Sequence, residues 1–219
     1  MRPLADTLAA AGFSVELPLL PGHGTSVEDM IPTGWNDWCG AAEAAYAQVA
    51  ARTEQVFAAG LSMGGSLAIW LAERHPEIAG LVVVNPLVEP AAPSFKEMLV
   101  GMLEYGGGLL PSISSDIAME CPREPAYDAT PIAPMISMFD GIEEIAAGLG
   151  GLRCPVLLLS SRKDHVVPAE SGDLLAAGAG GPVERVWLER SFHVATLDYD
   201  AAEIEARAVE FVNKVAVLR

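Results

Sequence analysis

Residues 55–74, QVFAAGLSMGGSLAIWLAER, join a short apolar stretch, a glycine-rich turn and a second apolar stretch. Gln55–Ala59 predicts a buried strand, and Met63–Arg74 predicts a helix. The turn Gly60-Leu61-Ser62-Met63-Gly64 between them has the pattern Gly-x-Ser-x-Gly. On a tight strand-to-helix turn, the serine Oγ projects above the sheet, and Gly60 and Gly64 leave room for neighbouring backbone. The alternative is a glycine-rich turn in some other kind of α/β protein.

Four further stretches are short, apolar and bounded by glycine, proline or polar residues, as strands are. The first three predict buried parallel strands and the fourth an edge strand: Phe13–Leu17, Leu81–Asn85, Pro155–Ser160 and Glu184–Leu188. Apolar residues at helical spacing predict helices near Leu4–Ala11, over Trp35–Arg52 and over Glu203–Val217. Strand and helix alternate, which predicts an α/β fold with a mostly parallel sheet and helices on both faces.

The segment from Pro86 to Arg153 interrupts this alternation. It has no strand signal, many prolines and the run Gly106-Gly107-Gly108, and it is too long for an ordinary loop. We expect a small, mostly helical cap over residues 86–153, inserted into a core made of residues 1–85 and 154–219. Methionines in the insertion fit either an adaptable apolar wall or the insertion's own core: Met98, Met102, Met119, Met135 and Met138.

The composition of the 219 residues excludes several classes of protein. Apolar residues make up 51%, and 13 basic against 29 acidic residues give a net charge of −16. Such a charge disfavours nucleic acid and anionic membranes as partners. No apolar run is long enough to cross a membrane, and the N-terminus does not resemble a signal peptide. The cysteines are odd in number and lack the spacing of metal ligands, so we expect no disulfide framework, no metal site and a reducing, cytoplasmic location: Cys39, Cys121 and Cys154. We also expect no cofactor.

A serine nucleophile needs a base to remove its proton. His193 follows the last predicted strand, and such a loop reaches the carboxyl edge of the sheet where Ser62 is expected. We therefore predict that His193 is the base, and we expect structural roles for the other histidines: His23, His75 and His165.

The base in turn needs a carboxylate that orients it. Asp164 follows the strand Pro155–Ser160, again at a carboxyl end of the sheet. Asp198 and Asp200 compete for this role, but they follow His193 closely in sequence, and Asp200 is also a predicted N-cap of the last helix. The chain order Ser62, Asp164, His193 is the order expected of α/β-hydrolases.

The chain resembles the α/β-hydrolases, specifically the bacterial carboxylesterase and monoacylglycerol lipase family, over nearly its whole length. The resemblance rests on five stretches: residues 20–24 (LPGHG), 35–38 (WNDW), 60–64 (GLSMG), the segment around Asp164, and 191–198 (SFHVATLD). It implies a Ser/Asp/His triad, an acyl-enzyme intermediate and a cap over an apolar acyl tunnel. It further implies small uncharged esters as substrates, from short- and medium-chain esters to monoacylglycerols. The backbone N–H of Met63 is one expected oxyanion donor.

The sequence departs from this family at its start. Family members carry a strand and a His-Gly loop upstream of the first helix, and that loop supplies the second oxyanion donor. Here the chain opens inside that helix, so we hypothesise that Met1 is an internal methionine of a longer protein. Alternatives to an active esterase are an inactive or unstable fragment that acts only by association, and a thioesterase or acyltransferase with the same triad. An open strand edge also favours a homodimer.

Overall fold

Four parallel strands form the central sheet of the computed structural model, which describes residues 1–112, 115–121 and 124–217. The spatial order of the strands is β1-β2-β5-β6. Their bounds are Phe57–Leu61 for β1, Gly80–Val84 for β2, Val156–Ser161 for β5 and Val183–Leu188 for β6. Each strand therefore lies within two residues of a predicted one.

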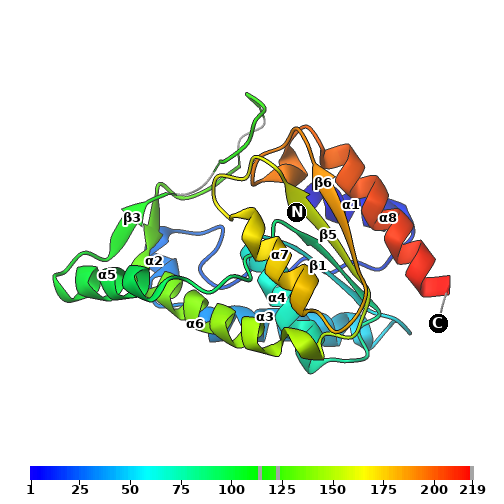
Figure 1. The fold of residues 1–219 in the computed structure, drawn as a ribbon, viewed down its shortest axis with the longest axis horizontal. Coiled ribbons are helices and arrows are strands. Elements are labelled where there is room, and N and C mark those ends of the chain that lie inside the picture. Colours follow the sequence, from blue (N-terminus) through cyan, green and yellow to red (C-terminus); the bar gives the residue numbers. More distant parts are fainter. Residues whose placement is uncertain (113–114, 122–123, 218–219) are drawn as a thin grey trace.

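Helices cover both faces of the sheet (Figure 1). One face carries α1 (Arg2–Ala10) and α8 (Ala201–Val217). The other face carries α3 (Trp35–Ala50), α4 (Met63–Arg74), α6 (Ile132–Gly148) and α7 (Ala169–Gly178). The structure thus has the predicted α/β architecture, with a parallel sheet and helices on both faces, and α4 has the predicted bounds.

Alternation along the strands divides the core into two layers. In β2, Leu81 and Val83 pack with Leu67 of α4, whereas Val82 and Val84 pack with Ile204 of α8. Successive side chains of a strand point to opposite faces, so a strand buried on both faces reads as a continuous apolar run. This is why β2 and β5 were recognisable in the sequence.

The predicted strand Phe13–Leu17 is wrong, because the structure has no strand at these residues. Gly12, at φ +96°, ends the turn after α1, and the chain then runs in extended form along the surface. Leu17 is 39% exposed and Leu19 71% exposed. A cavity of about 800 Å³ lies between this stretch and β1, so the two do not pair as strands.

The outer edge of β1 faces this cavity. The carbonyl of Val56 and the amide of Ser62 both bond toward β2, and backbone direction alternates along a strand. The backbone groups of Phe57, Ala59 and Leu61 therefore point to the open edge, and the side chain of Ala59 is exposed.

Residues 86–153 contain α5 (Pro93–Glu104), β3 (Leu109–Pro111), β4 (Ala129–Pro131), α6 and a 3-10 turn (Leu149–Gly151). The sequence shows no strand signal here, yet β3 and β4 form a two-stranded antiparallel sheet. Strands of three residues are too short to show a period of two. Met135 is buried in the insertion's own core, with Met102 and Met138 packed against it, which supports the second reading of the methionines.

The remaining elements are short: α2 (Val27–Met30) and the 3-10 turn Ala195–Leu197. Together with α5 and β3, α2 lies to one side of the sheet in Figure 1. The second half of α6 belongs to the core layer of α3 and α4, through Ile142 and Ile145. Among the described residues, no helix combines the length and the apolar character needed to cross a bilayer.

Candidate active site

Ser62 occupies the strained turn between β1 and α4. Its φ is 54° and its ψ −124°, a region that non-glycine residues rarely adopt and that recurs at functional sites. Its amide donates to the carbonyl of Val84 at 3.0 Å, which ties the turn to β2. The sequence pattern thus predicts both the location and the backbone geometry of this serine.

The glycines around Ser62 differ in why a side chain would or would not fit at each position. A Cβ on Gly60 would lie 2.0 Å from the carbonyl oxygen of Gly64, so no side chain fits there. A Cβ on Gly65 would lie 2.9 Å from Cβ of Pro86, so this glycine lets α4 lie close to the neighbouring loop. The prediction that Gly64 leaves room for backbone is wrong, because a Cβ there would meet no atom within 4 Å.

Met63 is the first residue of α4. The first N–H groups of a helix have no intrahelical acceptor and carry the positive end of the helix dipole. The Met63 amide is therefore free of the helix ladder, as an oxyanion donor must be.

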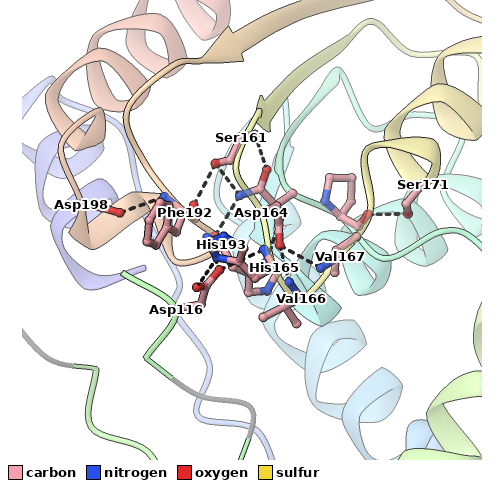
Figure 2. A network of polar contacts seen from close by, with 12 residues as sticks. Asp116, Ser161, Asp164, His165, Val166, Val167, Ser171, Phe192, His193 and Asp198 are labelled. Carbon is pink, nitrogen blue, oxygen red and sulfur yellow. Dashed lines mark hydrogen bonds and ion pairs between the residues drawn. The ribbon is translucent and has the colours of Figure 1, made fainter. Parts of the chain in front are cut away.

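His193 and Asp164 form a buried pair (Figure 2). Nδ1 of His193 lies 2.8 Å from Oδ2 of Asp164, and the two side chains are 7% and 4% exposed. The other oxygen of Asp164 accepts the amides of Val166 and Val167, both at 2.8 Å. The carboxylate is therefore fixed by its own turn while it accepts the ring N–H. With Nδ1 as donor, Nε2 carries the lone pair that a general base needs.

The structure thus brings Asp164 and His193 together, and it places Ser62 at the end of β1. Within the described residues, no hydrogen bond joins the Ser62 hydroxyl to the His193 ring. In enzymes without bound substrate, such contacts are often long and tighten only when the reacting groups are in place.

The competing carboxylates bind backbone instead of the His193 ring. Asp200 accepts the amides of Arg190 and Ser191 at 3.0 and 2.9 Å. It also stands at the predicted N-cap position directly before α8, where its carbonyl accepts the amide of Ile204 at 3.0 Å. Asp198 accepts the amide of Phe192 at 2.9 Å. Both carboxylates therefore shape the loop that carries His193.

His23 and His75 have partners away from His193. His23 contacts the carbonyl of Pro21 and stands edge-on to Trp38. His75 pairs with Glu43 and Glu77; burial lowers its pKa, but these two carboxylates outweigh burial and hold the pKa above its usual value.

His165 hydrogen-bonds Asp116 of the insertion at 2.8 Å. The position of His165 beside Asp164 in the sequence gives no sign of this contact with Asp116.

Asn85 is a site residue that the sequence analysis placed only within a strand. It lies just after β2 with φ 44°, a conformation that asparagine tolerates better than most residues. Its Nδ2 donates to the carbonyl of His193 at 2.8 Å and to Oγ of Ser161 at 2.9 Å, while its Oδ1 accepts the Ser161 amide. Asn85 therefore ties the ends of β2 and β5 to the loop of His193. The signal available in the sequence was a polar asparagine directly after the apolar run of β2.

A second small cavity, of about 10 Å³, lies between Asn85, Asp164 and the start of α7. The larger cavity described above lies along β1, away from the His193–Asp164 pair. In the described part of the chain, no group of three or more histidine, cysteine or acidic side chains is arranged to hold a metal ion.

Comparison with known proteins gives consistent results. Residues 1–200 match the model of the Hydrolase_4 family, described as serine aminopeptidase, S33. The thermostable monoacylglycerol lipase of Bacillus sp. (strain H-257) is 42% identical over 221 residues, covering 99% of this chain and 86% of that protein. The carboxylesterase of Bacillus subtilis (strain 168) is 26% identical over 220 residues, covering 98% of this chain and 87% of that protein.

Solved structures agree with these relatives. A structure from work on LipS and LipT, two metagenome-derived lipolytic enzymes, is similar with a TM-score of 0.90 at 36% identity, covering 98% of this chain and 87% of that chain. The monoacylglycerol lipase of Paleococcus ferrophilus has a TM-score of 0.68 at 21% identity, covering 97% of this chain and 88% of that chain. The second likeness concerns the fold alone.

Proposed function

We propose that this chain, which belongs to the Hydrolase_4 family (serine aminopeptidase, S33), hydrolyses carboxylic esters of small uncharged alcohols through an acyl-enzyme intermediate. The observation that carries the proposal is the buried His193–Asp164 pair at the sheet edge where Ser62 ends β1. The names of the relatives, monoacylglycerol lipase and carboxylesterase, support an ester rather than a peptide bond as the target.

In the acylation step, Nε2 of His193 takes the proton of Ser62 while Oγ attacks the ester carbonyl carbon. The carbonyl oxygen becomes an oxyanion, and the amide of Met63 donates a hydrogen bond to it. Asp164 holds the imidazole in the required tautomer and stabilises the imidazolium. His193 then protonates the leaving alcohol as the C–O bond breaks, which leaves the acyl group on Ser62.

Deacylation repeats the sequence with water. His193 takes a proton from water, the hydroxide attacks the acyl carbon, and the proton passes to Ser62 Oγ as the acid leaves. The same steps release an acyl group from a thioester or transfer it to another alcohol. Thioesterase or acyltransferase activity therefore differs only in the leaving group or the acceptor.

The setting of the reaction is part of the same proposal. Residues 86–153 act as a cap whose apolar side chains select the acyl group, and Met98 and Phe95 of α5 are among its exposed apolar residues. Three free cysteines support a reducing, cytoplasmic location. The open edge of β1 supports self-association into a homodimer.

Turnover of p-nitrophenyl esters tests the proposal. We expect the wild-type chain to hydrolyse them and Ser62→Ala to lose about 10⁴-fold or more in kcat, because no other group supplies the nucleophile. Ser14→Ala, at an exposed serine outside the site, is the control and should match the wild type. Equal turnover by Ser62→Ala and the wild type would refute the nucleophile. A panel of esters and thioesters of increasing acyl length measures the selectivity of the cap.

A folded wild-type chain that hydrolyses none of these substrates would favour a second candidate function. That candidate is an inactive chain that acts only by association, and the open edge of β1 is the observation that favours it.

A further inference from the structure

Asp116 lies in the insertion, yet its side chain is directed at the loops of the proposed triad (Figure 2). Its side chain is 17% exposed. It is 77 residues from His193 and 49 residues from His165 in sequence. Such distant contacts depend on how the insertion folds back over the core.

One oxygen of Asp116 bridges the two loops. Oδ2 accepts the amide of His193 at 3.0 Å and the amide of His165 at 3.1 Å. His165 directly follows Asp164, so the bridge joins the backbone beside the proposed acid to the backbone of the proposed base.

Two further contacts strengthen this bridge. Oδ1 of Asp116 accepts from Nδ1 of His165 at 2.8 Å, and the carbonyl of Asp116 accepts the amide of Val194 at 3.0 Å. The His165 ring also stands edge-on to Phe192, with ring centroids 4.5 Å apart. Asp116 therefore contacts the chain on both sides of the His193–Asp164 hydrogen bond.

A second carboxylate holds the insertion in return. Asp198 accepts the amides of Ala118 and Met119 at 2.7 and 3.1 Å, in addition to that of Phe192. Two carboxylates thus bind segment 116–119 to the loop of His193: Asp116 from the segment and Asp198 from the loop. Asp116 is held in place rather than free to swing away.

The charge state of Asp116 agrees with this arrangement. Burial raises the pKa of its carboxyl, but the His165 side chain and the amides of His193 and His165 outweigh burial and hold the pKa below its usual value. The carboxylate is therefore ionised at neutral pH, and an ionised acceptor makes stronger hydrogen bonds than a neutral one.

We propose that Asp116 is a positioning residue through which the insertion holds the loop of His193 in register with the loop of Asp164. This inference rests on the proposed function of His193 as the base. Asp116 makes no contact with the reacting atoms in this role. It acts through the two backbones, since a displacement of about 1 Å in a catalytic group can cost about 100-fold in rate.

The test compares Asp116→Ala and Asp116→Asn with Asp140→Ala. Asp140 is an acidic residue of the same insertion that pairs with Lys96 on the surface. We expect Asp116→Ala to lower kcat on a p-nitrophenyl ester by about 10- to 100-fold and to leave KM nearly unchanged. Asp116→Asn keeps one acceptor oxygen and should lose less, and Asp140→Ala should match the wild type.

Proton NMR gives a readout that does not need turnover. The Nδ1–H of His193, held by Asp164, should give a strongly downfield resonance that disappears in His193→Gln. We expect this resonance to broaden or vanish in Asp116→Ala, while thermal melting shows that the variant is folded. If Asp116→Ala fails to fold, Asp116→Asn replaces it in both measurements.

Wild-type kcat together with an unchanged His193 resonance in the folded Asp116 variants would overturn the inference. Turnover that survives Ser62→Ala would instead overturn the proposed function, so the two failures are distinguishable. A fall in kcat that Asp140→Ala reproduces would also count against the inference, because it would show a general response to changes in the insertion.

Discussion

The carboxyl ends of β5 and β6 and the outer edge of β1 belong to the same sheet but are held in different ways. The loops after β5 and β6 are joined by Asn85, and carboxylates of Asp116 and Asp198 bind their amides. The edge of β1 instead faces a cavity of about 800 Å³, with Ala59 exposed. The proposed base and its carboxylate therefore lie where buried side chains join the loops, while the proposed nucleophile follows a strand paired on one side.

This difference shows where the site is preorganised. On the His193 side, buried side chains satisfy loop amides that would otherwise be unpaired, so the geometry of the pair is over-determined. On the Ser62 side, the turn is held by its amide bond to Val84 and by packing of α4 on the sheet. Changes on the first side should lower catalysis or stability, and changes at the open edge should be tolerated.

The largest effect should come from removing the carboxylate that pairs with His193. Asp164→Asn should lower kcat on a p-nitrophenyl ester by about 10⁴-fold, because an amide in place of the carboxylate favours the wrong tautomer of His193. Asp198→Asn is the matched change at a carboxylate that binds only amides, and it should lose much less. A loss for Asp198→Asn as large as that for Asp164→Asn would show that Asp164 has no special role.

A smaller effect should come from the asparagine that joins the loops. Asn85→Ala removes three buried hydrogen bonds, and we expect it to lower the free energy of unfolding by about 1–3 kcal/mol. Denaturant unfolding measures this value, with Asn213→Ala at an exposed position of α8 as the control. Equal stability of the two variants would contradict the role of Asn85.

Glu73 lies near the end of α4, the helix that follows Ser62, and gives a prediction about the pH dependence of stability. Burial raises the pKa of its carboxyl to about 7, with Arg74 opposing and Glu144 adding to the rise. Among the described residues, its Oε1 has no hydrogen-bond partner. Between pH 4.5 and about 7, the Glu73 carboxyl therefore keeps its proton in the folded state, whereas in the unfolded state it has lost the proton. Stability should fall as the pH rises from about 4.5 to about 7.

Glu73→Gln removes this ionisation, so its stability should depend less on pH over that window. Thermal melting of the wild type and Glu73→Gln at several pH values gives the two slopes. Other titrating groups contribute equally to both proteins and cancel in the difference. Parallel slopes would show that Glu73 does not titrate there.

The smallest effect should come from the open edge. Ala59→Ser should change the free energy of unfolding by no more than about 0.5 kcal/mol, because the side chain is exposed. Ala58→Ser, at the neighbouring position packed against the core, is the matched variant and should cost more. A larger loss for Ala59→Ser than for Ala58→Ser in denaturant unfolding would show that the edge is covered.

Local signals made most of this arrangement predictable. The strand-turn-helix around Ser62, the continuous apolar runs of β2 and β5, and the position of His193 after the last strand each follow from neighbouring residues. The strand predicted at Phe13–Leu17 failed because extended chain becomes a strand only beside a partner. Asp116 could not be found, since its contacts depend on the path of the insertion, and nothing near it in sequence marks them.

The most direct test of the central claim is the identity of the activated serine. Diethyl p-nitrophenyl phosphate phosphorylates such a serine with release of p-nitrophenol, and peptide mass spectrometry locates the adduct. We predict an adduct on Ser62 that forms rapidly in the wild type and much more slowly in His193→Ala. An adduct on another serine, or equal labelling of Ser62 in both proteins, would contradict the account.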